Sequence, residues 1–327
     1  MTVVVTGATG FIGANIVRVL LDTGETVRVL VRPNSDTRNL DGLPVDMVYG
    51  DIRDDASVRV ALQGCRTLYH VAAHYSLWTP HPEEMYATNV EGTANLLRLA
   101  LAVGVEKVVY TSSVATIGQP ADDTPGDETM TLQLSDAIGH YKRSKLLAEQ
   151  RALDLCQQGL PLVIVNPAAP IGPWDIKPTP TGKIIVDFLR RRMPAYLDTG
   201  LNLIDVQDVA RGHVLAAQYG RIGERYILGH QNLSLQAILQ VLAEVSGLRA
   251  PSWRIPYGLA LATGYMSEWV ACYTHKAPLV PLAGVKMARR PMYFNAQKAV
   301  RELGLPQSPI DAAMRRAVQW FRERGYV

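Results

Sequence analysis

A glycine-rich loop near the N-terminus constrains the fold of this chain more than any other feature. The β-branched run TVVVT at 2–6 predicts a buried strand, and GATGFIG at 7–13 then leads into a helical pattern. Gly7 permits a tight turn, Gly10 lets the backbone approach a ligand, and Gly13 permits close packing of the helix on the strand. The free N–H groups at the start of such a helix bind the pyrophosphate of a dinucleotide. The sequence therefore predicts a dinucleotide-binding fold that begins at the first strand.

Strand and helix patterns alternate through the first half of the chain. Apolar, β-branched runs predict further strands at 26–31, 45–49, 67–71, 107–111 and 161–165. Helical patterns occur at 11–21, 56–62, 82–102 and 138–157. This alternation is typical of crossover units and a parallel sheet, and near-continuous apolar strands indicate a sheet covered on both faces. The predicted fold class is α/β, a Rossmann-type doubly wound parallel sheet with a smaller mixed C-terminal substrate domain.

The second half of the chain is less regular. Five prolines between 167 and 180 predict a loop over 168–182. Helices are expected at 183–192, 233–246, 257–273, 295–303 and 309–324, and short strands at 201–206 and 225–228. We expect a dinucleotide-binding domain formed by 1–165 plus about 200–229, and a substrate domain formed by about 166–199 and 230–327.

Composition excludes several classes of protein. With 48% apolar and 19% charged residues over 327 positions, the chain can bury a core and is not disordered as a whole. A net charge of +3 without any long basic block argues against nucleic-acid binding. Three scattered cysteines form neither a disulfide framework nor a metal site, and no metal is expected. We find no secretory signal and no apolar run long enough to span a membrane, so the expected location is cytoplasmic.

The end of the second strand bears on which nucleotide binds. An acidic residue there would accept hydrogen bonds from a ribose 2′-OH, but Arg32 takes this position and the next acid is Asp36. A guanidinium suits a phosphate dianion, so NADP(H) is favoured, with NAD(H) as the alternative. After the third strand, Asp51 and Ile52 are expected to contact the adenine.

A tyrosine and a lysine indicate the chemistry. Tyr141 and Lys145 are four residues apart on the predicted helix 138–157 and therefore share one face. A phenol with a pKa near 10 is a poor base at neutral pH, and a nearby positive charge lowers that pKa. TSS at 111–113 ends the fifth strand, at the edge where parallel sheets bind ligands. A serine hydroxyl there can bind the substrate oxygen that the tyrosine protonates or deprotonates.

These motifs together make the chain resemble the extended short-chain dehydrogenase/reductases. The motifs that carry this resemblance are TGATGFIG at 6–13, GDIRD at 50–54, TSS at 111–113 and YKRSK at 141–145. The resemblance implies that Ser113, Tyr141 and Lys145 are catalytic, with Ser112 as the alternative serine. It also places Asn89, within ATNVEGT at 87–93, beside the active site.

The same resemblance implies a cofactor site along the carboxyl ends of the strands. The turn after the sixth strand would run past the nicotinamide. The expected cofactor-binding residues are Thr6, Gly7, Thr9, Gly10, Phe11, Ile12, Gly13, Arg32, Asp51, Ile52, Ala72, Ala73, Thr111, Tyr141, Lys145, Asn166 and Pro167.

Within this superfamily the chain resembles the dihydroflavonol-reductase-like members. It is more similar still to the bacterial hopanoid-associated sugar epimerase group, through 74–93, 138–145 and 166–189. The resemblance implies NADP(H)-dependent hydride transfer to or from a carbonyl or hydroxyl carbon of a sugar-like or polyol substrate in hopanoid side-chain formation. An NAD-dependent nucleotide-sugar epimerase or dehydratase is the first alternative, because it would use the same residues. A non-catalytic dinucleotide sensor is the second, and the presence of both Tyr141 and Lys145 disfavours it.

Several further residues are candidates for substrate binding. His74, Tyr75 and Trp78 follow the fourth strand on the ligand side of the sheet, where a packed loop is the alternative interpretation. Lys177 and Lys183 flank the proline-rich loop and could instead be solvated. With Ser113, these five residues form the expected substrate set. Three polar residues of 203–213 are expected to be structural: Asp205, Asp208 and His213.

Two regions suggest partners. The apolar segment 257–273 predicts either a core or interface helix, or an apolar surface for a lipid-like substrate or for peripheral membrane contact. Glu268 and the lack of a basic flanking face favour the first interpretation. The long helices 82–102 and 138–157 could pair with a second subunit to form a homodimer.

Overall fold

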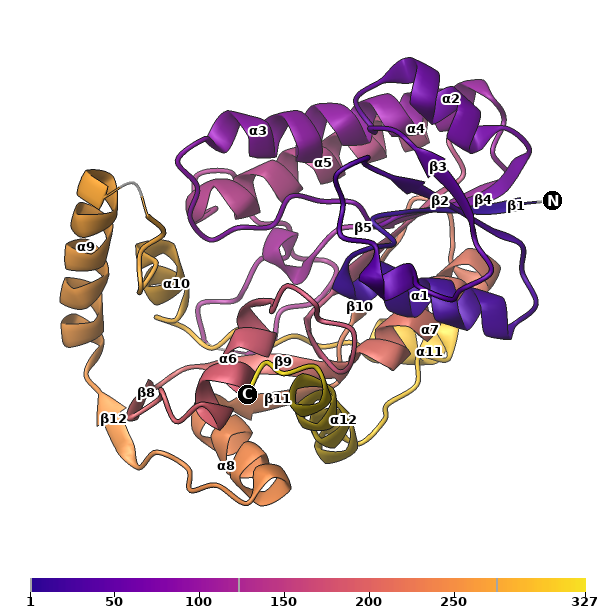
Figure 1. Ribbon diagram of the computed structural model, residues 1–327. Helices are drawn as coiled ribbons and strands as arrows, with labels where there is room; N and C mark the ends of the chain where they lie inside the picture. Colours follow the sequence, from indigo (N-terminus) through magenta and orange to yellow (C-terminus); the bar gives the residue numbers. More distant parts are fainter. Residues whose placement is uncertain (1, 123, 275) are drawn as a thin grey trace.

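The computed structural model describes residues 2–122, 124–274 and 276–327. A large parallel sheet with helices on both faces occupies one side of the molecule (Figure 1). The other side consists of two small sheets and their helices, and the helix α9 (Tyr257–Thr274) stands at its outer edge. The predicted fold class is confirmed, and the exact domain boundaries remain a prediction.

The large sheet has seven strands in the order β10, β6, β5, β4, β1, β2, β3. All pairs of neighbours in it are parallel. The strands are β1 (Thr2–Thr6), β2 (Val27–Val31), β3 (Asp46–Tyr49), β4 (Cys65–His70), β5 (Lys107–Thr111), β6 (Leu162–Pro167) and β10 (Arg225–Leu228). The chain runs outward from β1 to β3 and returns to β4 on the other side of β1. The carboxyl ends of β1 and β4 therefore flank a topological switch point, where such sheets bind ligands.

Alternation along β1 explains the two helical layers. Val3 and Val5 belong to one buried cluster and Val4 to the other, because successive side chains of a strand point to opposite faces. The first face is covered by α1 (Phe11–Asp22), α7 (Val206–Tyr219) and α11 (Gln297–Leu303). The second is covered by α2 (Asp55–Leu62), α4 (Thr93–Ala102) and α5 (Gly139–Gln157).

The helical segment predicted at 82–102 is continuous but not uniform. It begins as α3 (Pro82–Tyr86), continues through the π-helical turn η2 (Ala87–Gly92) and ends as α4. Such π-helical turns insert an extra residue into a helix and often occur at functional sites. Here the turn contains Asn89, which the sequence places beside the active site.

The C-terminal part contains a mixed sheet in the order β11, β9, β7. Its strands are β7 (Ala169–Ile171), β9 (Gly200–Asp205) and β11 (Gln231–Ser234). The helices α6 (Pro180–Leu189), α8 (Leu235–Ser246) and α12 (Ile310–Glu323) pack with it around a separate apolar core. Ser234 caps α8, and Gly247 ends it in the left-handed conformation.

The prediction of one loop over 168–182 was wrong at both ends. β7 lies within it, and α6 begins at Pro180. Pro170 fits in β7 because that strand lies at the edge of its sheet and pairs only with β9. The sequence analysis also missed β11 and the ribbon of β8 (Ala195–Leu197) with β12 (Trp253–Ile255), which are too short to show a period.

After β12 the chain forms α9 and then α10 (Leu282–Met287), a helix the sequence analysis did not predict. The two helices pack against each other. In Figure 1, α10 lies between α9 and the rest of the molecule. Within the described ranges, no helix is both long and apolar enough to cross a membrane.

Candidate active site

The glycine loop after β1 has the backbone geometry that the sequence predicts. Gly7 adopts the left-handed conformation, with φ at +72°, and a Cβ there would lie 2.6 Å from the backbone nitrogen of Ala72. A Cβ at Gly13 would overlap the carbonyl oxygen of Gly7. Gly7 also accepts a hydrogen bond from the N–H of Gly10 at 3.0 Å. The close approaches at Gly7 and Gly13 require glycine, so the loop lies tightly against the end of β4 and the start of α1.

The N-terminus of α1 fits an anionic ligand. Gly10 is its N-cap residue, no side chain caps the helix, and its first turn contains no acidic residue. The first N–H groups of a helix have no partner within the helix and carry a partial positive charge. The residues present therefore fit the pyrophosphate of a dinucleotide, and Phe11, Ile12 and Gly13 would supply the amide groups.

The arginines near the end of β2 differ in their partners. Arg28 donates to Asp46 at 2.7 Å, and Arg38 forms an ion pair with Asp36 at 2.6 Å. The exposed side chain of Arg32 forms no hydrogen bond or ion pair with any residue that the structure describes. Of these three, only Arg32 has its guanidinium available for a ligand.

The residues expected around an adenine lie after β3. Asp51 forms an ion pair with Arg53 at 2.7 Å, and this contact lowers the pKa of its carboxyl. Ile52 is buried against Gly92, where a Cβ would lie 2.8 Å from its side chain. Asp51 is thus held as a carboxylate at the surface, while most of Ile52 is used in packing.

The three expected catalytic side chains meet at the carboxyl end of β5. Tyr141 lies on the first turns of α5, and burial raises its pKa to about 12, while a hydrogen bond with Ser113 opposes the rise. Lys145, one turn further on, donates to the carbonyl oxygen of Thr111 at 2.8 Å and to the hydroxyl of Tyr110 at 3.2 Å. Burial lowers the pKa of Lys145 to about 8, and the Glu149 carboxylate opposes this shift.

The two adjacent serines have different environments. The Ser112 hydroxyl is buried and donates to the carboxylate of Glu149. Ser113 is half-buried, caps the short helix η3 (Val114–Thr116) and accepts from the N–H of Ala115 at 3.1 Å. The Ser112 hydroxyl is committed to Glu149, whereas Ser113 acts on the pKa of Tyr141, so Ser113 is favoured over Ser112 as the serine of the site.

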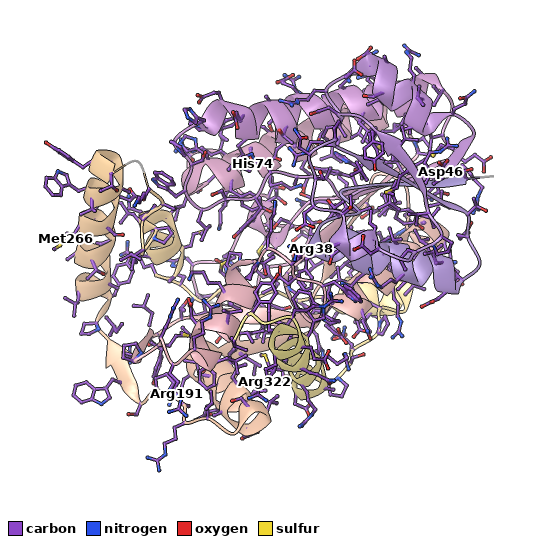
Figure 2. All side chains as sticks on the ribbon, viewed as in Figure 1. Arg38, Asp46, His74, Arg191, Met266 and Arg322 are labelled. Carbon is purple, nitrogen blue, oxygen red and sulfur yellow. The ribbon has the colours of Figure 1, made fainter. Side chains whose placement is uncertain are left out.

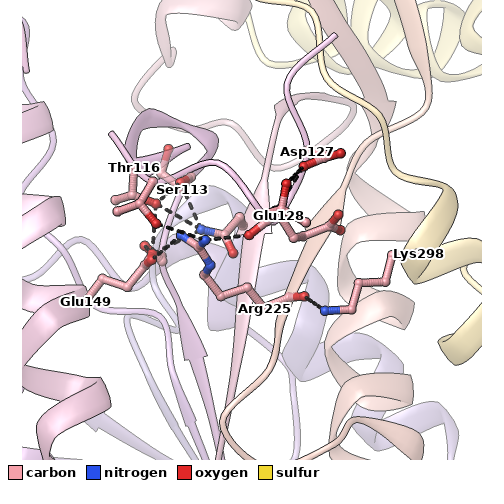
Figure 3. Close-up of polar contacts among 11 residues, drawn as sticks. Ser113, Thr116, Asp127, Glu128, Glu149, Arg225 and Lys298 are labelled. Carbon is pink, nitrogen blue, oxygen red and sulfur yellow. Dashed lines mark hydrogen bonds and ion pairs between the residues drawn. The ribbon is translucent and has the colours of Figure 1, made fainter. Parts of the chain in front are cut away.

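Glu149 forms the centre of a buried polar network behind these residues (Figure 3). It accepts from Thr116 Oγ1 at 2.8 Å and from Asn166 Nδ2 at 3.1 Å, and it pairs with Arg225 at 3.2 Å. Asn166 Nδ2 also donates to the carbonyl oxygen of Ser113 at 3.0 Å. The network therefore joins β5, β6, β10 and α5 beneath the expected catalytic residues and fixes the backbone that presents Ser113.

Sequence reasoning missed Glu149 and Arg225. Tyr141, Lys145 and Glu149 are spaced by one turn each along α5, so the helical period could have identified the glutamate. Arg225 lies on the edge strand β10, and no sequence pattern connects it with α5. Asn166, expected near the cofactor, instead directs its amide into this network.

Asn89 positions the loop that follows β4. Its side-chain oxygen accepts from the N–H of His74 at 2.6 Å, and its Nδ2 donates to the carbonyl oxygen of His74 at 2.9 Å and to Ser144 Oγ at 3.0 Å. The π-helical turn thus fixes the backbone at His74. The next residue, Tyr75, packs its ring edge-on against Tyr141, with 4.4 Å between ring centroids. Of the expected substrate residues, Tyr75 therefore lies against Tyr141, the residue expected to be catalytic.

The other substrate candidates have no contact with Tyr141 among the described residues. Trp78 is half-buried further along the same loop, where its backbone N–H donates to Ser76 Oγ. Lys183 pairs with Asp187 on its own helix at 2.7 Å. Lys177 is exposed and acts electrostatically on Asp36, beyond β2. No described contact joins either lysine to Tyr141, and their assignment to the substrate stays a prediction.

Most of the remaining expected cofactor residues lie near the switch point between β1 and β4, and Pro167 lies two strands away. Thr6 Oγ1 contacts His70 Nδ1 at 2.8 Å and accepts from the N–H groups of Val71 and Ala72 at 3.2 Å each. Thr9 bonds Asn39 through its carbonyl oxygen, at 3.0 Å. Ala73 is exposed and Pro167 ends β6. These contacts hold the ends of β1 and β4 together at the sheet edge.

Asp205, Asp208 and His213, which were expected to be structural, all bond to other parts of the protein. Asp205 caps α7 and pairs with Arg316, and Asp208 accepts from the N–H of Ser308 at 2.7 Å. His213 is buried between Thr111 Oγ1 and the carbonyl oxygen of Val209, at 2.9 and 2.8 Å. It is a satisfied core histidine, and the Thr111 hydroxyl is directed into the core.

The doubly wound sheet and the residues at its carboxyl edge define an oxidoreductase of the extended short-chain type. A family model described as "NAD dependent epimerase/dehydratase family" matches residues 3–229, and the chain belongs to this family.

Relatives of known name agree with this class. A protein of Synechocystis, which its name provisionally calls a dihydroflavonol 4-reductase, is 54% identical and covers 99% of this chain and 95% of its own length. "Sterol demethylase protein B" of Methylococcus capsulatus is 37% identical over the whole of both chains. The crystal structure of gox2253 is 44% identical, with a TM-score of 0.89 over 100% of this chain and 99% of that one. A UDP-glucose 4-epimerase of Thermotoga maritima, 22% identical with a TM-score of 0.81 and 99% of each chain covered, shares the fold.

Proposed function

We propose that this protein is an NADP(H)-dependent reductase that acts on a carbonyl group of a sugar-like or polyol chain attached to a triterpenoid, in hopanoid side-chain formation. The observation that carries this proposal is the cluster of Tyr141, Ser113 and Lys145 at the carboxyl end of β5. When bound, the reduced nicotinamide supplies the hydride that adds to the carbonyl carbon.

The protonation state of Tyr141 supports reduction. With its pKa raised to about 12, the side chain is a neutral phenol at physiological pH and can give its proton to the carbonyl oxygen. Ser113 holds that oxygen within reach of the phenol. The carbon gains the hydride and the oxygen gains the proton, so the product is an alcohol and Tyr141 is left as a phenolate.

Lys145 is suited to stabilise that phenolate. Its ammonium group has three N–H donors, and two of them are used by Thr111 and Tyr110. The third is available for a ribose hydroxyl of the cofactor. The positive charge one helical turn from Tyr141 favours the phenolate as it forms and lowers the cost of proton transfer.

The preference for NADP(H) rests on Arg32. Its guanidinium lies exposed beyond the end of β2, and the acid that would select NAD(H) is absent at this position. Arg28 and Arg38 do not compete for this role, because both are paired with aspartates.

The substrate class rests on the resemblance to the hopanoid-associated group and on the sterol-related name of the Methylococcus protein. Tyr75 beside Tyr141 supplies an apolar, aromatic wall that suits a polycyclic substrate. A cytoplasmic location and a homodimer through the helices predicted at 82–102 and 138–157 belong to the same proposal.

The experiment follows NADPH absorbance with a series of carbonyl compounds. A ribosylated triterpenoid aldehyde is expected to consume NADPH, and the Tyr141→Phe variant serves as the control for enzymatic turnover. Absence of NADPH consumption across the series would contradict the proposal. A tightly held NAD that co-purifies and supports interconversion of nucleotide sugars would establish the epimerase alternative instead.

A further inference from the structure

We infer that the outer face of α9 is a docking surface for an anionic lipid membrane. Six large apolar side chains of this helix face solvent, and its three buried residues are small. The buried residues are Ala260, Gly264 and Ala271. The exposed ones are Leu259, Tyr265, Met266, Trp269, Val270 and Tyr273. The helix is therefore inverted relative to an ordinary surface helix, which buries its large apolar residues.

The exposed residues form one continuous surface. Leu259, Met266 and Tyr273 recur two turns apart and therefore lie in one row along the helix. Trp269 lies beside that row, with 5.6 Å between its ring centroid and that of Tyr273. Met266, Trp269 and Tyr273 are 65%, 67% and 80% exposed. Figure 2 shows Met266 pointing away from the body of the molecule.

The inner face explains why these residues remain outside. A Cβ at Gly264 would lie 3.2 Å from Leu282 of α10, so the small residues let the two helices approach closely. Glu268, the sole acid of the segment 249–290, accepts a hydrogen bond from the N–H of Leu282 at 3.1 Å. Its carboxylate is thus drawn toward α10. Glu268 therefore does not oppose membrane contact, and the expected lack of basic flanking residues is wrong, because basic residues lie on both sides of α9 in the sequence.

The charges around the face identify the occupant. All charged residues of 249–290 other than Glu268 are basic. Lys286 lies over the ring of Tyr265, at 5.5 Å from its centroid, and Lys276 follows the last turn of α9. Aromatic side chains flanked by cations are typical of surfaces that bind the headgroup region of anionic membranes. A second copy on the same face would bring like charges together, which disfavours a symmetric dimer there.

The helix α10, on which α9 packs, contacts two segments next to the site. A Cβ at Gly139 would lie 3.4 Å from Ala283 of α10, and one at Gly284 would lie 3.5 Å from Leu77. Gly139 precedes Tyr141 by two residues, and Leu77 belongs to the loop that carries Tyr75. Docking through α9 would therefore bring the site close to a membrane.

Vesicle sedimentation of the whole protein tests this inference without any need for activity. We expect binding to vesicles of equal parts phosphatidylcholine and phosphatidylglycerol, weaker binding to phosphatidylcholine alone, and a decrease in binding as salt is raised. Trp269→Ser combined with Met266→Ser should reduce binding by about tenfold or more. Lys286→Glu combined with Lys276→Glu should abolish the preference for the anionic lipid.

A matched control uses Tyr219→Ser, since Tyr219 is 62% exposed but lies at the end of α7 on the large-sheet side. It should bind vesicles as the wild type does. Absence of vesicle binding by the wild type would overturn the inference, as would equal losses in the control and the α9 variant. Self-association in analytical ultracentrifugation that the α9 substitutions remove would show that the face joins two copies instead.

Discussion

Two helices of the C-terminal part, α12 and α9, use similar residues in opposite ways. α12 buries Met314, Trp320 and Phe321 in the core and exposes charged residues such as Arg322 (Figure 2). α9 buries small residues and exposes Trp269 and Tyr273. The contrast shows that apolar content alone does not decide which side of a helix is inside. The size of the side chains at the contact decides it, because only small residues let α9 pack closely on α10.

The same contrast extends to the chemistry of the molecule. Around Tyr141 nearly every polar group has an internal partner, and the network of Glu149 holds the strands in place. The α9 face has no such partners among the described residues. We conclude that the sheet edge is built for a defined reaction, while α9 is built to contact something outside the protein.

The largest expected effect is a loss of activity from a substitution at the sheet edge that leaves the α9 face unchanged. Tyr141→Phe removes the proposed proton donor, so kcat should fall by about 10²- to 10⁴-fold. Stability and vesicle binding should be unchanged within error. Steady-state kinetics with NADPH and the ribosylated triterpenoid aldehyde measures the loss. A variant that keeps wild-type kcat would show that Tyr141 is not the donor.

Truncation of one aromatic residue on each helix tests the comparison through stability. Phe321→Ala should lower the free energy of unfolding by about 3–5 kcal/mol, because it opens a cavity in the core. Trp269→Ala should change it by less than about 0.5 kcal/mol, since the ring is exposed. Urea unfolding followed by circular dichroism gives both values. Similar losses in the two variants would mean that the α9 face is covered within the protein itself.

Glu149→Gln tests the network behind the site. It leaves the largely buried Arg225 without its charged partner, and we expect a loss of about 1–3 kcal/mol of stability. Because Glu149 opposes the fall in the pKa of Lys145, that pKa should decrease further in the variant. The pH profile of kcat should shift to lower pH accordingly. Leu153→Ala on the same helix is the control for stability, and should leave the pH profile in place.

A further expected effect concerns stability at low pH. His70 is buried between Thr6 and Thr93, and burial lowers its pKa from 6.5 to about 3. The unfolded chain therefore binds a proton below about pH 6.5 that the folded protein does not, and stability falls as pH decreases from 6.5 toward 3. His70→Gln should remove about 1 kcal/mol per pH unit from this slope.

Asp175 has the opposite effect on how stability varies with pH. The quantity to measure is therefore the difference in free energy of unfolding between the wild type and His70→Gln. Burial raises the pKa of its carboxyl from 3.8 to about 7, and its contribution to stability is lost as pH rises through that range. Denaturant unfolding at several pH values gives the difference curve. A difference that does not vary with pH would show that His70 is not the neutral, buried group described above.

Much of the sheet could be predicted because each of its strands is an uninterrupted apolar run beside a turn signal. The positions of Ser113, Tyr141 and Lys145 could also be inferred, since the first ends a strand and the other two share a helical face. Arg225 could not, because its contact with Glu149 spans 76 positions of the sequence. The orientation of α9 was left open for a related reason. Both of its faces are apolar in sequence, and only its packing on α10 distinguishes small buried residues from large exposed ones.

The most direct test of the central claim, that this is an NADP(H)-dependent reductase, is calorimetric binding of NADPH and NADH to the wild type, Arg32→Ala and Arg38→Ala. We predict that NADPH binds more tightly than NADH to the wild type and to Arg38→Ala. Loss of one phosphate–guanidinium contact should cost about 1.5–3 kcal/mol, so Arg32→Ala should erase roughly a ten- to hundredfold preference. Tighter binding of NADH by the wild type, or a preference that survives Arg32→Ala, would contradict the claim.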